Sequence, residues 1–268
     1  MRATWLLIVS VLAWTAPARA QGLIWNLPED GKWIRYEGTY EQVDTQPDSP
    51  QGTVTIKWLR QLTIKSVGRV DAEFSGKTQP CRWVEIKQMT GKESEAGLDP
   101  GPIGTRLYKV LIPESAVRGT LQDADGIPVV FLPIVKGYRR IGNEEVAPQP
   151  IRSGILHVYP MLCMVRHYPS LETVAENEDP QAGIPFLKAT RLSGQTVIES
   201  PTLRETHKAE LWRTDELPFG LARWRVRITI EGKDVTDPRS SFRTLSTITV
   251  DMKAAEVGDE ARSDLAEQ

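Results

Sequence analysis

The sequence predicts a mainly β protein (a β-rich α+β fold) with one antiparallel sheet of about nine to eleven strands and a helical segment that covers it. Runs in which apolar and polar residues alternate occur in both halves of the chain, and tight turns join them. Residues 150–170 instead form a nearly all-apolar segment broken by prolines, which indicates a short buried helix. A sheet of many short antiparallel strands has to be closed, sandwiched or covered, and this segment is the obvious cover.

The N-terminal half carries the clearest alternation. In residues 53–65, one parity is mostly apolar (Val54, Ile56, Trp58, Leu62 and Ile64) and the other mostly polar, which is typical of a half-buried strand. A Gly-, Pro- and acid-rich stretch at 92–104 is expected to be a loop. The strands expected in this half are residues 33–43, 53–68, 69–74, 81–91 and 105–115.

Strand patterning returns after residue 183. A Ser-Gly turn at Ser193–Gly194 is expected to separate two strands, and three further strands should follow at 203–214, 221–232 and 240–252. No internal repeat or linker is evident, so residues 21–253 are expected to form a single domain. The remaining residues, 254–268, contain few large apolar side chains and are expected to be a polar, flexible tail.

The hairpin near the C-terminus has one apolar and one basic face. Pro218 and Gly220 suit its turn, and in the second strand Trp224, Val226 and Ile228 lie on one face. The other face presents a stripe of three arginines, Arg223, Arg225 and Arg227. This stripe would either bind an anion or carboxylate, or be a solvated face paired with acids across the strands. The acid-rich neighbouring strand favours the second interpretation.

The N-terminus reads as a secretory signal peptide, residues 1–20. Arg2 precedes a short apolar core at 5–14, and Ala18 and Ala20 fit the cleavage pattern, so the mature chain should begin at Gln21. An uncleaved anchor is the alternative. We expect an exported protein, periplasmic or secreted, with no transmembrane segment in the mature chain. The net charge of −2 gives no basic surface for nucleic acid.

The two cysteines of the chain, Cys81 and Cys163, are candidates for a disulfide, because an exported protein matures where disulfides persist. Such a bond would close a long loop and contribute about 4 kcal/mol in the chain-entropy model. Two buried free thiols are the alternative, since free cysteine is among the most buried residue types.

Several segments resemble uncharacterised exported bacterial proteins that are similar to the lipoprotein-localisation (LolA/LolB-like) family. The resemblance lies in the hairpin 212–229, in "WIRYEGTYEQ" at 33–42 and in the strand pair 81–88 and 108–114. It implies an antiparallel, unclosed half-barrel whose apolar cavity is covered by a helical lid. The chain lacks the cysteine that a lipid-anchored member carries after its signal, and no ligand-binding residue can be transferred.

Common catalytic motifs are absent from the sequence, including the nucleophile elbow, the zinc-protease motif and the phosphate-binding loops. Paired acids such as Glu144–Glu145 and Asp215–Glu216 are more typical of solvated loops than of glycoside chemistry. One cluster could bind copper or zinc through His157, Cys163 and His167, with Met161 and Met164 beside them. The apolar context explains the sulfur-containing residues equally well as core. We therefore expect no enzyme activity, no cofactor and no metal.

The sequence therefore favours an exported, non-enzymatic protein that binds or carries a lipid or another hydrophobic ligand. The lid side chains expected to contact cavity or ligand are Leu156, Met161, Leu162 and Met164. The alternatives are a structural or protein-interaction module of the cell envelope without a small-molecule ligand, and the soft-metal protein described above. Expected partners are a hydrophobic ligand or an envelope protein.

Overall fold

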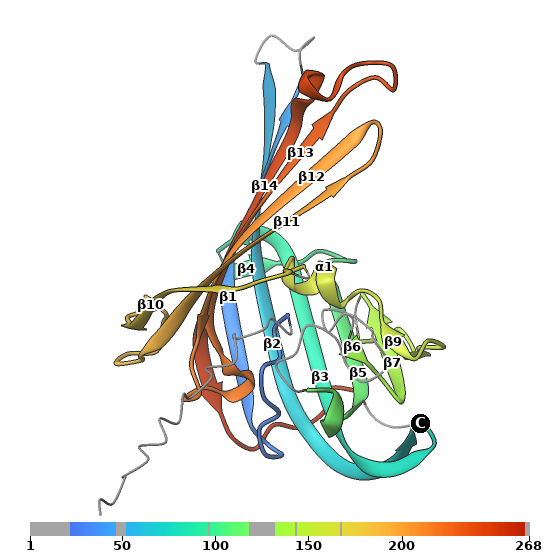
Figure 1. Ribbon diagram of the computed structural model, residues 1–268. Helices are drawn as coiled ribbons and strands as arrows, with labels where there is room; N and C mark the ends of the chain where they lie inside the picture. The colour runs from blue at the N-terminus through green and yellow to red at the C-terminus, as the bar shows by residue number, and fades with distance from the viewer. Residues whose placement is uncertain are drawn as a thin grey trace, which may run out of the picture.

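The computed structural model describes residues 22–46, 52–95, 97–117, 132–142, 144–166 and 168–265. The fold is mainly β, and its centre is a 12-stranded antiparallel sheet that does not close into a barrel (Figure 1). The strand order is β10-β11-β12-β13-β14-β1-β2-β3-β5-β7-β8, with β4 paired to β3. The expected fold class, an unclosed antiparallel half-barrel with a helical segment, is confirmed.

The central strands are long. They are β1 (Trp33–Thr45), β2 (Thr53–Phe74), β3 (Lys77–Ser94), β5 (Thr105–Pro113), β11 (Ala189–Glu199), β12 (Leu203–Arg213), β13 (Leu221–Gly232) and β14 (Arg243–Gly258). Shorter strands of the same sheet are β4 (Gly97–Asp99), β7 (Lys136–Ile141), β8 (Gln149–Pro150) and β10 (Glu172–Glu178). A separate two-stranded sheet pairs β6 (Leu132–Pro133) with β9 (Ile155–Leu156). One short α-helix, α1 (Tyr159–Cys163), occurs in the described part of the chain.

Two of the expected strand boundaries are wrong. Residues 53–74 form one strand of 22 residues, because Gly68 adopts a φ of +145° at a bulge against β3 and the strand continues beyond it. Gly194 likewise lies inside β11. A Cβ at this position would lie 2.9 Å from Cγ of Tyr168, so the glycine makes room for that ring and does not form a turn.

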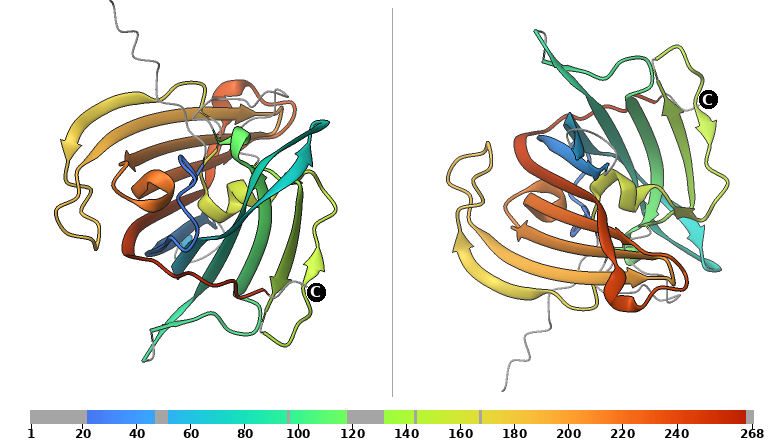
Figure 2. Two further views of the ribbon diagram at one scale, coloured as in Figure 1. Left: turned by 90° about the horizontal axis from the view of Figure 1, so that it is seen from below. Right: turned by 90° about the horizontal axis from the view of Figure 1, so that it is seen from above.

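The sheet curls so that its two halves face each other across a trough. Seen along the strands, β10–β14 lie on one side and β2–β7 on the other, with α1 and the N-terminal residues between them (Figure 2). Interruptions of register between β1 and β14, and in the β12–β13 and β13–β14 pairs, bend and twist the strands locally. The concave side of the sheet therefore forms a core rather than a flat surface.

This core is filled beneath α1. The phenol oxygen of Tyr159 accepts hydrogen bonds from the backbone N–H groups of Leu23 and Ile24, at 2.8 and 2.9 Å. The indole of Trp224 donates to the carbonyl of Cys163 at 2.9 Å, and its ring meets that of Tyr36 edge-on with centroids 4.8 Å apart. All six of these residues are fully or almost fully buried. The mid-chain segment is therefore an integral part of the core.

Of the two alternatives for the cysteines, the disulfide is wrong and the free thiols are confirmed: Cys81 and Cys163 are both buried and unbonded to each other. Cys163 belongs to the main core in the trough, whereas Cys81 packs with Trp83 and Leu111 in a small separate cluster. The alternation along β3 explains the separation, because Val84 and Ile86 contact the main core while residues 81 and 83 have the opposite parity. The sheet itself separates the two sulfur atoms.

The C-terminal residues differ from the expected polar tail. Residues 254–258 complete β14, and residues 259–265 continue as a segment held by hydrogen bonds to β2, β3 and β5. The signal-peptide prediction for residues 1–20 lies outside the described residues. No helix in the described part of the chain has the length and hydropathy required to cross a membrane.

Candidate functional site

A groove lies beside α1, on the concave face of the sheet where β1, β2 and β3 extend past the helix. Its volume is about 740 Å³, within the range typical of small-molecule sites. The strands supply most of its walls, α1 and the residue after it supply one side, and the β3–β5 connection closes the other. The residues lining it are Tyr40, Gln42, Ile56, Trp58, Arg60, Gln88, Thr90, Gly91, Lys92, Asp99, Pro100, Gly101, Ile103, Gly104, Arg106, Met161 and Met164.

Arg60 lies at the base of this groove and is only 6% exposed. One of its terminal nitrogens donates to the carbonyl of Leu162 at 3.2 Å and to that of Met161 at 3.5 Å. Burial lowers the pKa of the guanidinium. Interactions with Cys163 and Tyr40 raise this pKa by less, and the positive charge of Arg106 has the smallest effect and lowers it. Arg60 makes no ion pair with any carboxylate of the described residues.

Polar side chains continue from this base along β1 and β3. The hydroxyl of Tyr40 donates to Oε1 of Gln42 at 2.6 Å, and Nε2 of Gln42 donates to both carboxylate oxygens of Asp44 at 2.9 and 3.0 Å. Across the groove, Nε2 of Gln88 donates to Oγ1 of Thr90 at 3.0 Å. Each of these groups therefore has a partner within its own strand, whereas Arg60 donates to two backbone carbonyls of the α1 segment and pairs with no described carboxylate.

The four expected lid residues divide into two pairs. Leu156 and Leu162 are 2% and 3% exposed and belong to the main core. Met161, in contrast, is 55% exposed, and together with Met164 it lines the groove. Within α1, Leu162 lies against the trough and Met161 lies toward the groove, while Leu156 belongs to β9 and Met164 follows the helix.

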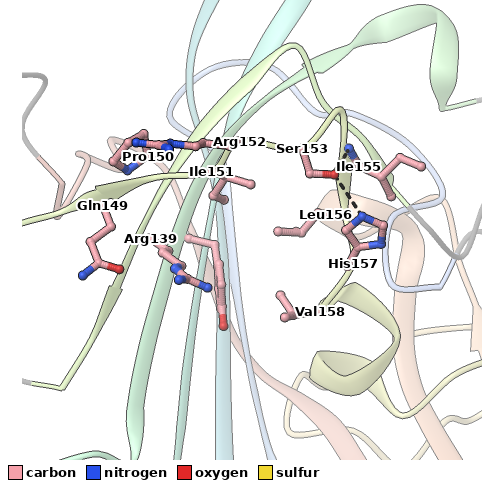
Figure 3. A pocket seen from close by; sticks show the side chains of 11 residues that line it. Arg139, Gln149, Pro150, Ile151, Arg152, Ser153, Ile155, Leu156, His157 and Val158 are labelled. Atoms are coloured by element: carbon pink, nitrogen blue, oxygen red, sulfur yellow. Dashed lines mark hydrogen bonds between the residues drawn. The ribbon is translucent and has the colours of Figure 1, made fainter.

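A second pocket of about 630 Å³ lies between β5, β7 and the loop that precedes α1 (Figure 3). Ser153 and His157 point toward each other there, with Oγ and Nε2 2.9 Å apart, and Arg139 projects from the β7 side. Ser153 also accepts a hydrogen bond from the backbone N–H of Ile155 at 3.2 Å. No described carboxylate orients the other nitrogen of His157, so the third member of a nucleophilic triad is not provided by this part of the chain.

The described structure does not bring the candidate metal ligands together. Within the described ranges, no group of three or more His, Cys, Asp or Glu side chains could hold a metal ion. His157 faces the second pocket, and the thiol of Cys163 points into the core and donates to the carbonyl of Tyr159 at 3.2 Å. Burial raises the pKa of this thiol to about 12, so the thiolate that metal binding needs is disfavoured. The third candidate, His167, lies outside the described residues.

The arginine stripe is largely paired with acids. Arg223 is 5% exposed and forms a two-pronged pair with Asp251, Nε to Oδ1 at 2.9 Å and the terminal nitrogen to Oδ2 at 2.7 Å. Arg225 also reaches Asp251, at 2.8 Å, and approaches Glu210 at 3.9 Å. Arg227 is exposed and has no ion pair with a described residue. Two of the three candidates therefore stabilise the outer face of the sheet.

Comparison with known proteins adds no family. No protein-family model matches the chain, and no curated protein matches it. Among solved structures the chain is similar to DynF from the dynemicin biosynthesis pathway of Micromonospora chersina. The likeness covers 93% of this chain and 90% of that chain, at 12% identity and a TM-score of 0.23. A likeness this low carries no argument about function.

Proposed function

We propose that this protein is an exported, non-enzymatic binding protein whose ligand is hydrophobic and lies in the groove beside α1. The observation that carries the proposal is a groove of about 740 Å³ walled by Trp58, Ile56, Ile103 and the two methionines of the lid segment. Exposed apolar side chains gathered around a concavity mark binding sites, because water leaves them when a ligand enters. The resemblance to the lipoprotein-localisation family points to the same class of ligand.

The ligand would bind beside α1 and not beneath it. Below the helix, Tyr159, Leu162 and Cys163 fill the trough together with residues of the sheet, and no room remains for an acyl chain without displacing them. Opening that core would cost several kcal/mol for each large side chain uncovered. The groove, by comparison, is already open, so binding there needs no movement of the lid segment.

Binding of a fluorescent fatty-acid probe tests this function. The wild-type protein should bind the probe with a dissociation constant in the micromolar range, about −8 kcal/mol. Met161→Glu should weaken binding at least tenfold, since it places a charge on the exposed apolar wall while leaving the core intact. Val235→Glu is the matched control, because Val235 is 68% exposed and outside the groove, and it should bind like wild type.

One observation favours a protein-interaction module as a second candidate. The strands β11–β14 extend beyond α1 (Figure 1). Several large apolar side chains of β11, β12 and β14 are exposed: Val197, Ile198, Leu203 and Leu245. Each is between 38% and 50% exposed. A folded protein that binds no fatty-acid probe at all would leave this candidate in place of the carrier.

A further inference from the structure

We propose that the groove selects an amphiphile with a single anionic head group, carboxylate or phosphate, which Arg60 and Arg106 bind while its apolar chain lies against Trp58 and Met161. This inference rests on the proposed function and specifies its ligand class. The head-group assignment depends on the charged residues of the groove, whereas binding of a hydrophobic ligand does not require these charges.

The first support is the state of Arg60. A guanidinium presents five N–H donors, and the acceptors of Arg60 among the described residues are two backbone carbonyls that share one of its nitrogens. Buried charges in proteins are almost always paired with an opposite charge. Arg60 is 6% exposed, lines the groove and has no carboxylate partner in the described chain, so an oxyanion entering the groove would supply the missing charge.

The second support is the balance of charge around the groove. Three of its lining residues are cationic, Arg60, Arg106 and Lys92, whereas Asp99 is the one acid among them in the described lining. Asp99 is engaged locally: its Oδ1 accepts the backbone N–H of Gly101 at 2.9 Å, and it faces Lys92 across the β3–β4 pair. Lys92 also lies over the ring of Trp58, 6.0 Å from its centroid. The positive charges of Arg60 and Arg106 are therefore left uncompensated.

The third support is the separation of polar and apolar surface. Arg60 is buried on β2 and Arg106 lies on β5, whereas the strongly exposed apolar side chains of Met161 and Ile103 form the rim. Met161 is 55% exposed and Ile103 is 75% exposed. A planar guanidinium binds the two oxygens of a carboxylate or phosphate through parallel hydrogen bonds, and methylene groups gain free energy by covering the rim. A small anion would leave the rim bare, and an uncharged lipid would leave the arginines unpaired.

Calorimetry with chain-matched ligands separates these contributions. Dodecanoate, dodecyl phosphate, dodecanol and acetate would each be titrated into wild-type protein near neutral pH. We expect at least one of the two anionic amphiphiles to bind about tenfold or more tightly than dodecanol, and acetate not to bind measurably. The comparison of dodecanoate with dodecyl phosphate shows which head group is preferred. Preference for the anion should weaken at high salt.

Two variants locate the preference. Arg106→Gln changes an exposed residue that forms no ion pair with a described residue. Arg60→Gln removes the buried charge. Each variant should reduce the preference for the anion severalfold, while the affinity for dodecanol stays within about twofold of wild type. The unchanged dodecanol affinity shows that the groove is intact, and Arg227→Gln on the outer face is the control. Equal binding of dodecanol and both anions, or a preference that survives both substitutions, overturns the head-group assignment and leaves the hydrophobic carrier. Absence of binding by all four ligands overturns both.

Discussion

Asp251 on β14 binds two arginines of the outer face of β13, Arg223 and Arg225. Burial by itself would raise the pKa of its carboxyl, but hydrogen bonds from Arg223 and Arg225 outweigh burial and hold the pKa below the ordinary value of 3.8. Arg223 also lies over the ring of Trp212, 4.8 Å from its centroid. One carboxylate therefore compensates two guanidinium groups, one of them buried.

Asp251→Asn should accordingly lower the free energy of unfolding by about 2–3 kcal/mol at pH 7, because it leaves the buried Arg223 without its counter-charge. A group with a lowered pKa stabilises the fold above about pH 4 and loses that contribution as the pH falls through its folded-state pKa. The gap between wild type and variant should therefore be constant from pH 7 to 5 and shrink below pH 4. Denaturant titrations across this range measure it.

Arg227→Ala is the control for that experiment, since Arg227 is exposed and has no ion pair with a described residue. It should change stability by less than about 0.5 kcal/mol. A loss as large as that of the Asp251 variant would show that the stripe acts through overall charge and not through the Arg223–Asp251 pair.

The two thiols provide a second residue-level prediction. Because Cys81 and Cys163 are both fully buried and belong to separate clusters, neither should react with a thiol reagent in the native protein. Both should react completely in denaturant without any reductant, which mass spectrometry of the labelled protein detects. Protein that stays unlabelled in denaturant would contradict the separation of the two residues by the sheet.

The two arginines of the groove, Arg60 and Arg106, could have been identified from the sequence, but their signal is easily overlooked. Arg60 has the parity of Trp58 and Leu62 in β2, and Arg106 has the parity of Tyr108 in β5, so both lie on the apolar side of their strands. A charged residue on an apolar parity is the signal that would have identified them. The stripe at 223–227 is more conspicuous in the sequence, yet the structure pairs most of it with acids.

At the scale of elements, one buried carboxylate, that of Glu85, accepts several of the hydrogen bonds that hold the C-terminal segment. Glu85 is fully buried in β3 and accepts hydrogen bonds from Oγ of Ser263 at 2.7 Å and from the backbone N–H groups of Asp264 and Leu265 at 3.0 and 3.3 Å. Lys65 lies 3.3 Å from Glu85 and 2.7 Å from the carboxylate of Asp264. This network explains why residues 259–265 lie along the sheet although few of them are apolar.

Glu85→Gln should release this segment, because an amide accepts weaker hydrogen bonds than a carboxylate and adds donors that face other donors. We expect amide hydrogen exchange in residues 259–265 to accelerate by tenfold or more, with a loss of about 1–3 kcal/mol in global stability. Glu41→Gln is the control, since the ion-pair partner of Glu41 among the described residues is the exposed Lys57. Unchanged exchange in the Glu85 variant would mean that other contacts hold the segment.

The positions of the strands could be predicted from the sequence, whereas the glycines at which a strand ends or continues could not be told apart. The alternation of side chains identified the positions of β1, β3, β5 and β12–β14 from the sequence, because half-buried strands need it. A glycine in such a run has several meanings, and only the neighbouring structure decides among them. Gly194 is required by the ring of Tyr168, a residue that lies 26 positions earlier in the chain and contacts it only after folding.

For the molecule as a whole, composition and residue pattern predicted the fold class. They did not predict whether the trough beneath α1 is filled by side chains or holds a cavity. Many alternating strands require a curved, covered sheet, and the apolar segment near residue 160 was the evident cover. Whether that cover encloses a cavity depends on packing. Here Leu23, Ile24 and the α1 side chains fill the space below the helix, so the open volume lies beside it. The sequence carries no pattern that distinguishes these outcomes.

The most direct test of this account uses Trp58 as a reporter within the groove. A fatty acid brominated on its chain quenches tryptophan emission only at short range, and Trp58 lines the groove whereas Trp33 does not. We expect the brominated acid to quench the wild-type protein and Trp33→Phe to a similar extent. Trp58→Phe should abolish most of the quenching although the acid still binds, as an unbrominated competitor would show. Quenching that persists in Trp58→Phe, or binding without any quenching in wild type, would contradict the assignment of the ligand to this groove.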